Sequence, residues 1–140
     1  MTAIVDAGVL YALVDSADPS HSRAVRAIEG EPEAIVVPLV VLPEVCYLIG
    51  SRIGWAEEMS FLRYLADSDW RLEPLVDADV ERVVGLMGEH GSTGLGFVPA
   101  AMIATAERMG AARIYTFNRQ HFDRVRPTHV DRFELRPNGD

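Results

Sequence analysis

Short apolar runs rich in β-branched residues alternate along this chain with segments of helical periodicity. The runs predict strands at residues 2–5, 34–37, 70–75, 113–117 and 132–135. The segments between them predict helices at residues 9–14, 21–29, 38–52, 55–66, 77–89 and 100–109. Strands that alternate with helices form a parallel sheet with helices on both faces. The expected fold is therefore α/β, a central parallel sheet flanked by helices.

Local sequence signals support four of these helices. Ser20 is a plausible N-cap for the helix at 21–29, and Gly110 closes the helix at 100–109. The helix at 55–66 is amphipathic, and the helix at 77–89 places apolar residues on one face. The residues expected on these two apolar faces are Phe61, Leu62 and Leu65 in the first helix and Val80, Val83, Val84 and Met87 in the second.

The chain has 140 residues, of which 49% are hydrophobic, so we expect one domain with a substantial core. Its boundaries are predicted at residues 1–136, followed by a frayed tail at 137–140. All 13 basic residues are arginine, and this absence of lysine excludes Schiff-base chemistry, a P-loop lysine and a receiver-type phosphoacceptor site. The single cysteine, Cys46, excludes an internal disulfide and a multi-cysteine zinc site, and we interpret it as a buried structural thiol.

The net charge of −8 argues against general affinity for nucleic acid, because phosphate binding depends on accumulated positive charge. Any nucleic-acid role therefore needs a local arginine patch, a metal ion, or both. The longest uncharged stretch, residues 91–106, is broken by glycine and proline and is shorter than the ~20 residues of a membrane span. These observations indicate a soluble, cytoplasmic protein that does not bind a membrane.

Two polar residues fall at carboxyl ends of predicted strands, where parallel sheets place their functional sites. Asp6 follows the first strand, and its carboxylate can either bind a hard cation or cap the next helix. Asn118 follows the strand at 113–117, and its amide oxygen is a further possible ligand, while Arg119 or Arg124 can contact phosphate. The alternative interpretation of Asn118 is an ordinary turn residue.

Glu44 is the only charged residue between Ala34 and Ser51. On a helix it is flanked by apolar residues, and an unpaired carboxylate in such surroundings is unfavourable. Glu44 must therefore reach solvent, an arginine or a metal ion.

Two further patterns carry weaker signals. The glycine-rich segment before Pro99 matches neither a P-loop nor a dinucleotide fingerprint, and Pro99 is predicted in the first turn of the next helix. The four histidines lack the spacing of a zinc site, so each is interpreted as a surface or hydrogen-bonded side chain: His21, His90, His121 and His129.

The order of these segments resembles that of PIN domains, and specifically of VapC-type toxins from bacterial toxin–antitoxin pairs. The matching segments are IVDAGVLYAL at 4–13, residues 15–21, VLPEVCYLI at 41–49, AAMIATAERMG at 100–110 and residues 113–122. The resemblance spans nearly the whole chain. It implies a PIN-like fold, a homodimer, and a metal-dependent endoribonuclease that a VapB-type antitoxin neutralises.

Members of this family are similar to one another in holding Mg²⁺ or Mn²⁺ with about four acids. By position, Asp6 and Glu44 match the first two acids. The third falls at Pro99, a frequent extra acid falls at Gly96, and the fourth falls at Asn118. This chain therefore keeps two carboxylate ligands and one neutral amide, which makes Asp6, Glu44 and Asn118 the candidate catalytic residues and Asp6 and Glu44 the candidate metal ligands.

Charge limits what such a site can hold. Two divalent ions ~4 Å apart repel by ~17 kcal/mol at an effective dielectric of ~20, and two carboxylates hardly balance that. A single Mg²⁺ needs only one or two carboxylates together with water and substrate phosphate. The sequence therefore predicts one weakly held Mg²⁺ or Mn²⁺ ion, with Asp6 and Glu44 close together and one of them titrating high when no cation is present.

The resulting functional hypothesis is a VapC-like toxin with weakened metal-dependent ribonuclease activity. One alternative is a catalytically silent PIN domain that binds protein or RNA. A second is a phosphoacceptor or small-molecule α/β domain, against which the absence of lysine argues. The resemblance further implies that an amphipathic antitoxin helix docks near the helices that follow Pro38 and Trp55, where Trp55, Met59, Phe61 and Tyr64 supply apolar surface.

Overall fold

The computed structural model describes residues 1–138 and contains a five-stranded parallel sheet. Its strands are β1 (Thr2–Val5), β2 (Ala34–Pro38), β3 (Arg71–Glu73), β4 (Arg113–Tyr115) and β5 (Glu134–Arg136), in the spatial order β3-β2-β1-β4-β5. The central strand is β1, in which Ile4 pairs with Val36 on one side and with Ile114 on the other. The predicted parallel α/β sheet is confirmed.

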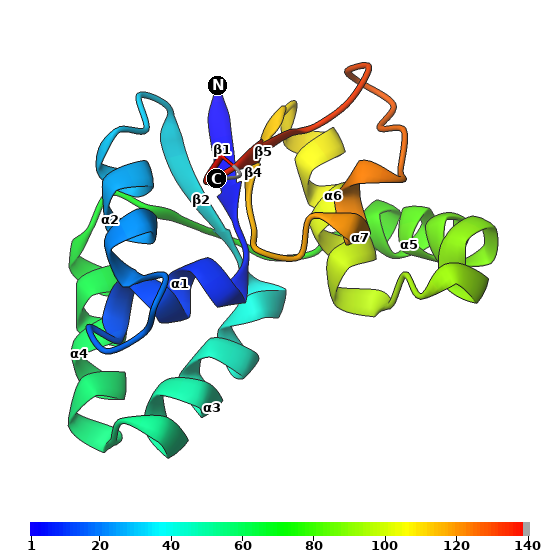
Figure 1. Cartoon of the computed structure of the whole chain (residues 1–140). Coiled ribbons are helices and arrows are strands. Elements are labelled where there is room, and N and C mark those ends of the chain that lie inside the picture. The colour runs from blue at the N-terminus through cyan, green and yellow to red at the C-terminus, as the bar shows by residue number, and fades with distance from the viewer. Residues whose placement is uncertain (139–140) are drawn as a thin grey trace.

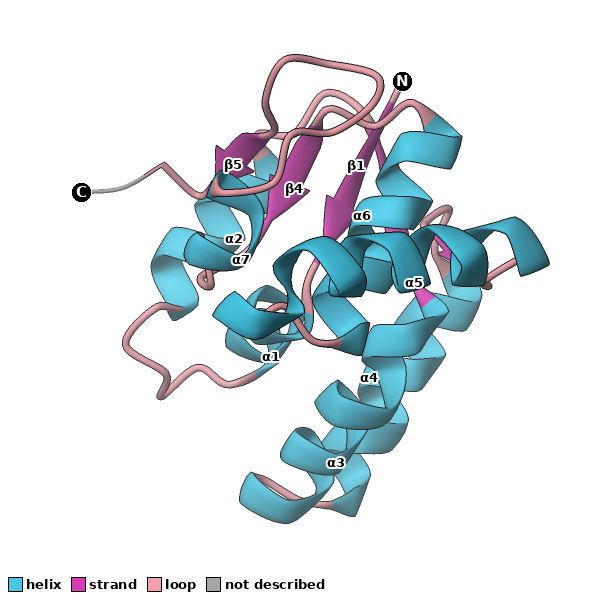
Figure 2. Cartoon of the chain, turned by 90° about the vertical axis from the view of Figure 1, so that its right-hand side faces the viewer, coloured by secondary structure: helices cyan, strands magenta, loops and turns pink. Residues whose placement is uncertain are grey.

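Seven α-helices and two short 3-10 turns connect the strands within residues 1–138. The helices are α1 (Ala7–Val14), α2 (His21–Glu29), α3 (Leu42–Arg52), α4 (Trp55–Asp67), α5 (Asp77–His90), α6 (Phe97–Met109) and α7 (Gln120–Asp123). The 3-10 turns are η1 (Leu39–Val41) and η2 (Gly91–Thr93). In Figure 1, α1, α2 and α4 lie on one side of the sheet, and α5, α6 and α7 lie on the other. Figure 2 shows α5 outermost on its side, packed against α6.

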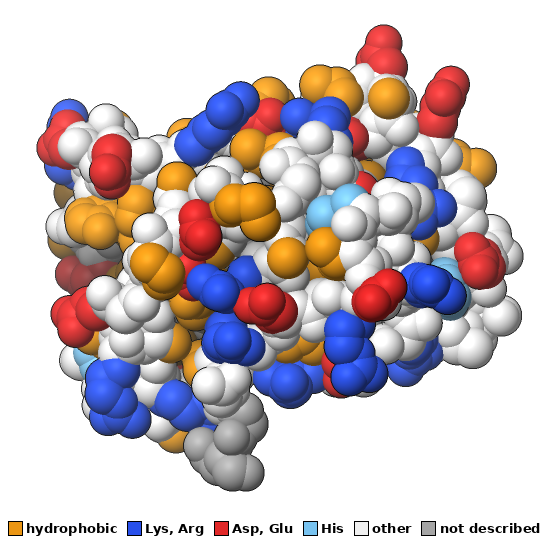
Figure 3. Space-filling model, turned by 90° about the horizontal axis from the view of Figure 1, so that it is seen from above, with side chains coloured by type: hydrophobic (Ala, Val, Ile, Leu, Met, Phe, Trp, Pro, Cys, Tyr) orange, Lys and Arg blue, Asp and Glu red, His pale blue; other side chains and the backbone are white. Residues whose placement is uncertain are grey.

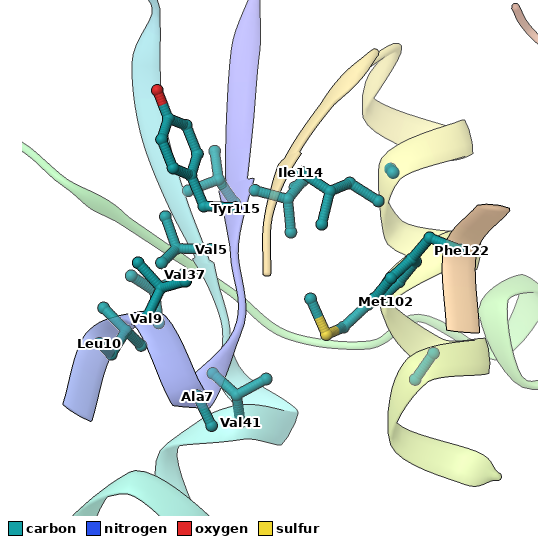
Figure 4. Packing of buried hydrophobic residues seen from close by; sticks show 14 of the residues in the cluster. Val5, Ala7, Val9, Leu10, Val37, Val41, Met102, Ile114, Tyr115 and Phe122 are labelled. Atoms are coloured by element: carbon teal, nitrogen blue, oxygen red, sulfur yellow. The ribbon is translucent and has the colours of Figure 1, made fainter. Parts of the chain in front are cut away.

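The core lies on both faces of the central strands. Side chains of β1, β2 and β4 such as Val5, Val36 and Ile114 are fully buried, as expected for strands covered on both faces. Figure 4 shows Met102 of α6 and Phe122 of α7 on the Ile114 side of the sheet. On the opposite side, residues of α1 pack against β1 and β2. The sequence pattern of short β-branched runs is therefore explained by two-sided burial.

Helix ends follow the predicted signals in two places and depart from them in one. Asp6 caps α1, and Gly110 ends α6 with a left-handed φ of 69°, which a side chain would disfavour. Ser20 occupies the N-cap position of α2, but its side chain makes no capping hydrogen bond. The reason is conformational, since its ψ of 2° departs from the extended geometry that directs a capping side chain at the helix. The Asp18 carboxylate instead accepts from the Ser20 amide.

The bounds of one strand and one helix differ from the predicted ones. β3 is only three residues long because it pairs with β2 at the edge of the sheet over Val36 to Pro38. The helix predicted at 38–52 divides into η1 and α3, with a proline in the first turn of α3. Helix α6 begins at Phe97, so Pro99 lies in its first turn, as predicted.

The predicted apolar face of α5 is wrong in part. Val83 is buried, but Val80, Val84 and Met87 are exposed. Helix α5 packs on α6 through Asp79, Val83 and Leu86 instead. The face that contacts the core is rotated because the buried Asp79 carboxylate must reach its arginine partner on α6. On α4, Phe61 and Leu65 are buried as predicted, while Leu62 is exposed.

An ion-pair network fixes α5, α6 and β3 to one another. The guanidinium of Arg108 donates to Asp79 Oδ1 at 3.0 Å and to Glu73 Oε1 at 2.9 Å, and both acids are buried. Arg82 on α5 makes a second, bidentate pair with Glu107 on α6. Charged hydrogen bonds of this kind satisfy carboxylates that burial would otherwise destabilise.

Three remaining predictions concern the surface. Cys46 is half-buried and not fully buried, and it packs against the edge of the core. Pro137 is buried, and its carbonyl accepts from Arg119 at 3.2 Å, whereas residues 139–140 of the predicted tail lie outside the described residues. Within residues 1–138, every helix is too short or too polar to cross a bilayer.

Candidate active site at the carboxyl edge of the sheet

Three chain segments meet where β1, β2 and β4 end. Asp6 follows β1 directly, Glu44 lies in the first turn of α3 after β2, and Asn118 lies in the turn between β4 and α7. The start of α1 and the turn into α3 are neighbours, as Ala7 and Val41 show in Figure 4. The parallel sheet therefore brings the candidate residues to one edge, as its topology requires.

Asp6 is held in place by two hydrogen bonds. Its Oδ1 accepts from the Ala7 amide at 2.7 Å, and its Oδ2 accepts from the Thr116 hydroxyl at 2.9 Å. Asp6 thus combines both roles considered for it, because a carboxylate that caps α1 keeps lone pairs that point to solvent or a cation.

The pKa of the Asp6 carboxyl is raised above its ordinary value. Burial is the main cause, since it removes water from the charged form, and the hydrogen bonds from Thr116 and Ala7 and the charge of His121 oppose the rise. A raised pKa was expected from repulsion by Glu44, so the direction agrees and the cause differs. A carboxylate that burial makes unfavourable gains from a bound cation, which is the behaviour of a metal ligand.

Thr116 is a site residue that the sequence reading missed. Its buried hydroxyl donates to Asp6 and accepts from the Asn118 amide at 3.0 Å, so one side chain orients both the carboxylate and the following turn. His121 was interpreted as a surface or hydrogen-bonded histidine, and the structure adds that its charge acts on Asp6. The signal available in the sequence was the polar residue that directly follows a buried strand.

Glu44 reaches solvent. Its neighbours Val41 and Val45 are buried, whereas Glu44 itself is exposed on the outer side of the first turn of α3. Of the three destinations that the sequence left open, the structure selects solvent. An exposed carboxylate at a helix start is favoured by the helix dipole and stays available to a ligand.

The resemblance assigns a third acid to the position of Pro99, whose side chain offers no ligand atom. Pro99 is half-buried in the first turn of α6 and carries no polar side-chain atom, and Gly96 precedes that helix. Asn118 is exposed, and its backbone carbonyl accepts from the His121 amide at 3.2 Å. Among residues 1–138, no group of three or more histidine, cysteine, aspartate or glutamate side chains is arranged to hold a metal ion. Asp6, Glu44 and Asn118 supply too few carboxylates for a centre of two divalent ions. Their two carboxylates and one amide fit the needs of a single ion.

A separate apolar groove lies between α1, α2 and α4. It has a volume of about 470 Å³, and its floor includes Leu13, Ile28, Phe61 and Trp70, with Glu29 and Glu57 beside them. The lining of this groove includes residues of α4 and none of α3, whereas the docking surface is predicted near both helices and stays a prediction. Trp55, Met59 and Tyr64 are exposed, whereas Phe61 is buried.

The sheet order, the capping aspartate and the acidic carboxyl edge define this chain as a PIN-like α/β domain. The chain belongs to the PIN domain family, whose sequence profile matches residues 3–126. It is 31% identical over 134 residues to Ribonuclease VapC26 of Mycobacterium tuberculosis, a match that covers 96% of this chain and 99% of that protein. The chain is therefore a VapC-like member of the family.

Solved structures share the fold at lower sequence identity. The Mycobacterium tuberculosis toxin VapC20, described as cleaving the sarcin–ricin loop, superposes with a TM-score of 0.76 at 22% identity, covering 83% of this chain and 89% of that one. A toxin–antitoxin complex from Klebsiella pneumoniae gives a TM-score of 0.68 at 23% identity, covering 88% of this chain and 92% of that one. These matches confirm the predicted PIN-like architecture.

Proposed function

We propose that this protein is a VapC-type toxin that hydrolyses RNA with one weakly held divalent ion and lower activity than a four-acid site would give. The observation that carries the proposal is the similarity to a VapC ribonuclease over 96% of this chain, together with the half-buried, hydrogen-bonded Asp6 at the carboxyl edge. An RNA substrate also fits a cytoplasmic location.

Each residue of the edge has a distinct part in this proposal. Asp6 and Glu44 would hold Mg²⁺ or Mn²⁺, and Asn118 would support the ion or a ligand water. When bound, the ion supplies charge that polarises the scissile phosphate and acidifies water. The Ala7 amide and the Thr116 hydroxyl fix the direction of the Asp6 carboxylate. The substrate phosphate is needed to complete the ion's ligands, so binding and activity are expected to be weak.

One observation favours an alternative function. Pro99 supplies no ligand in the first turn of α6, so the edge is incomplete relative to the family pattern. A catalytically silent PIN domain that binds protein or RNA is the alternative consistent with that loss.

RNA cleavage by the purified protein in Mg²⁺ or Mn²⁺ distinguishes the two functions. We expect slow cleavage that stops on addition of a chelator and is abolished in Asp6→Asn. The matched control is Asp67→Asn, because Asp67 is an exposed aspartate at the end of α4. Equal cleavage by Asp6→Asn and the parent would reject the assignment of Asp6. No cleavage by the parent in either ion would favour the silent alternative.

We also propose that a VapB-type antitoxin binds this chain through the groove between α1, α2 and α4. The groove is mainly apolar and has Glu29 and Glu57 in its lining, so it suits an amphipathic segment with a basic residue. Known structures of related folds include toxin–antitoxin complexes, which supports a partner of this kind. Co-purification with the product of an adjacent small gene, lost in Ile28→Glu and kept in Val84→Glu, tests the site. A homodimer remains part of the proposal, and sedimentation of the purified chain tests it.

A further inference from the structure

Charge is distributed unevenly along this acidic chain. Residues 1–107 contain 6 arginines and 17 acids, whereas residues 108–140 contain 7 arginines and 4 acids. The first part therefore has a formal charge of −11 and the second of +3, which together give the net −8. A basic segment within an acidic chain can form a local surface that attracts a negatively charged partner.

Part of this positive charge surrounds a cavity on the β4–β5 side of the sheet. The cavity has a volume of about 360 Å³, and Arg26, Arg113, Arg136 and Tyr115 are in its lining. Its acidic lining residue is Glu31, so the lining carries three positive charges and one negative charge. Figure 3 shows blue arginine side chains gathered along the side of the molecule where the C-terminal tail emerges.

One of these arginines is already neutralised. Arg113 donates to Glu31 at 2.6 Å and to Glu134 at 3.0 and 3.1 Å. Glu31 is almost fully buried and also accepts from the Tyr115 hydroxyl. Burial alone would raise the pKa of Glu31, but Tyr115, the Glu33 amide and Arg113 together hold that pKa below its ordinary value. Arg113 and Glu31 therefore form a structural pair that leaves little charge for a ligand.

Arg26, Arg119 and Arg136 are less closely paired with acidic side chains than Arg113 is. Arg136 lies 3.7 Å from Glu134, which is already occupied by two shorter hydrogen bonds from Arg113. Arg119 donates to the carbonyls of Leu135 and Pro137 but makes no ion pair among the residues that the structure describes. Arg26, in the last turn of α2, is exposed and likewise unpaired with any described carboxylate, although it also offsets the partial negative charge of that helix end.

Hydrogen bonds of the backbone and of Thr116 join the strand ends near these arginines to the candidate active site. The Thr116 amide donates to the Arg136 carbonyl at 2.7 Å, and the Thr116 hydroxyl donates to Asp6. The Asp6 amide donates to the carbonyl of Tyr115, which lines the cavity. Arg119 follows Asn118 in the chain. The strand ends that carry Tyr115 and Arg136 therefore lie next to Asp6.

We infer that Arg26, Arg119 and Arg136 form a binding surface for the phosphates of single-stranded RNA, next to the carboxyl edge and independent of any metal ion. The inference rests on the proposed ribonuclease function for its choice of RNA. Guanidinium groups recognise phosphate oxygens through paired N–H donors, and three of them on one side would offset the repulsion between RNA and an acidic protein. Such contacts position the strand without reading its sequence.

The test is RNA binding in EDTA, measured by fluorescence anisotropy at several salt concentrations. The main variant is Arg26→Gln with Arg136→Gln. The matched control is Arg63→Gln with Arg132→Gln, since both of these are exposed arginines without an ion pair in the described part of the chain. Each lost phosphate contact reduces the slope of log K against log salt by about 0.7 for a single strand. We expect the main variant to lose about 1.4 of slope and the control to keep the parental slope.

The outcomes separate this inference from the proposed function. Equal slopes for the main variant and the control, or no RNA binding by the parent at low salt, would overturn the arginine surface. Cleavage in Mg²⁺ with equal slopes would leave the ribonuclease standing and reject the surface. A loss of slope in the main variant alone, with no RNA cleavage by the parent, would support the arginine surface and reject the ribonuclease. Arg119→Gln serves as a second variant, and thermal unfolding of every protein verifies that the fold is retained.

Discussion

At the scale of single residues, Asp6 and Thr116 show how one buried hydroxyl organises the carboxyl edge. The Thr116 hydroxyl joins the end of β4 to the end of β1, and its second hydrogen bond fixes the turn that carries Asn118. Asp6 is therefore the cap of α1 and, in the proposed function, also a ligand of the metal ion. The two roles place stability and function on the same side chain.

Replacing Asp6 by asparagine should make stability less dependent on pH. Burial raises the folded-state pKa of Asp6 above its model value of 3.8, so its contribution to stability is full below that value and is lost as pH rises through the folded pKa. The free energy of unfolding of Asp6→Asn relative to the metal-free parent should be largest near neutral pH and shrink on acidification. Urea denaturation across this range measures it, with Asp67→Asn as control, and a difference constant with pH would contradict the prediction.

Removing the Thr116 hydroxyl should weaken the edge and shift Asp6 further. Thr116→Val loses the hydrogen bond that lowers the pKa of Asp6, so that pKa should rise, and the Asn118 amide loses its acceptor. We expect a loss of about 1–2 kcal/mol in the free energy of unfolding. NMR titration of the Asp6 carboxyl and urea denaturation check both effects. Thr116→Ser keeps the hydroxyl and should resemble the parent; an equal shift in Thr116→Ser and Thr116→Val would show that loss of the hydroxyl is not the cause.

At the scale of elements, a buried network and not an apolar stripe sets how α5 packs. Arg108 on α6 binds Asp79 on α5 and Glu73 on β3 at once, so three elements share one guanidinium. This arrangement leaves Val80, Val84 and Met87 on the outer face of α5. Hydrophobic periodicity identified the helix correctly but not the side of it that contacts the core.

Arg108→Met should be strongly destabilising, because it leaves the buried Asp79 carboxylate without a cation and leaves the buried Glu73 carboxylate with only the exposed Arg71. The expected loss is about 3–5 kcal/mol in the free energy of unfolding. Arg71→Met is the matched control, since Arg71 also pairs with Glu73 but its side chain is 65% exposed. An exposed pair is worth about 0–1 kcal/mol. Chemical denaturation compares the two variants, and similar losses would show that burial of the acids is not the cause.

At the scale of the whole molecule, α6 packs beside the 3-10 turn η1 that leads into α3. Family members are similar in holding their ion with about four acids. Here the segment at the start of α6 contributes Pro99, and the turn after β4 contributes Asn118. In the proposed function, the PIN-like fold is therefore retained and fewer acids hold the ion.

Restoring acids at both positions should raise metal binding and RNA cleavage. Pro99→Asp with Asn118→Asp takes the edge from two carboxylates to four, enough to balance a second divalent ion. Asp is well tolerated in the first turn of a helix, so the change at α6 should be mild. We expect a gain of about 10-fold or more in affinity for Mn²⁺, since even outer ligands matter by ~10–100-fold.

Calorimetric Mn²⁺ titration and RNA cleavage on the parent and the double variant measure this gain. Without metal, four neighbouring carboxylates repel, so the variant should be less stable than the parent and recover on adding Mn²⁺ by mass action. A parent that already binds two ions and cleaves as fast as the variant would refute the view that Pro99 and Asn118 replace lost ligands.

The sequence by itself determined the order of strands and helices, the parallel α/β class and the position of Asp6 after the first strand. Strands that are buried on both faces require short runs of apolar, β-branched residues, which are visible in the sequence. A helix that starts directly after a strand is stabilised by a capping side chain such as that of Asp6. Local context in the sequence also singled out Glu44 and Asn118, and the family resemblance supplied their match to the family's acids and the position of a further acid at Pro99. The tertiary structure was needed to show that the Thr116 hydroxyl donates a hydrogen bond to Asp6 and that burial raises the pKa of Asp6. It was also needed to show that Arg108 binds Asp79 and so selects the face of α5 that packs on α6. These three depend on contacts between residues far apart in the chain, which no local pattern records.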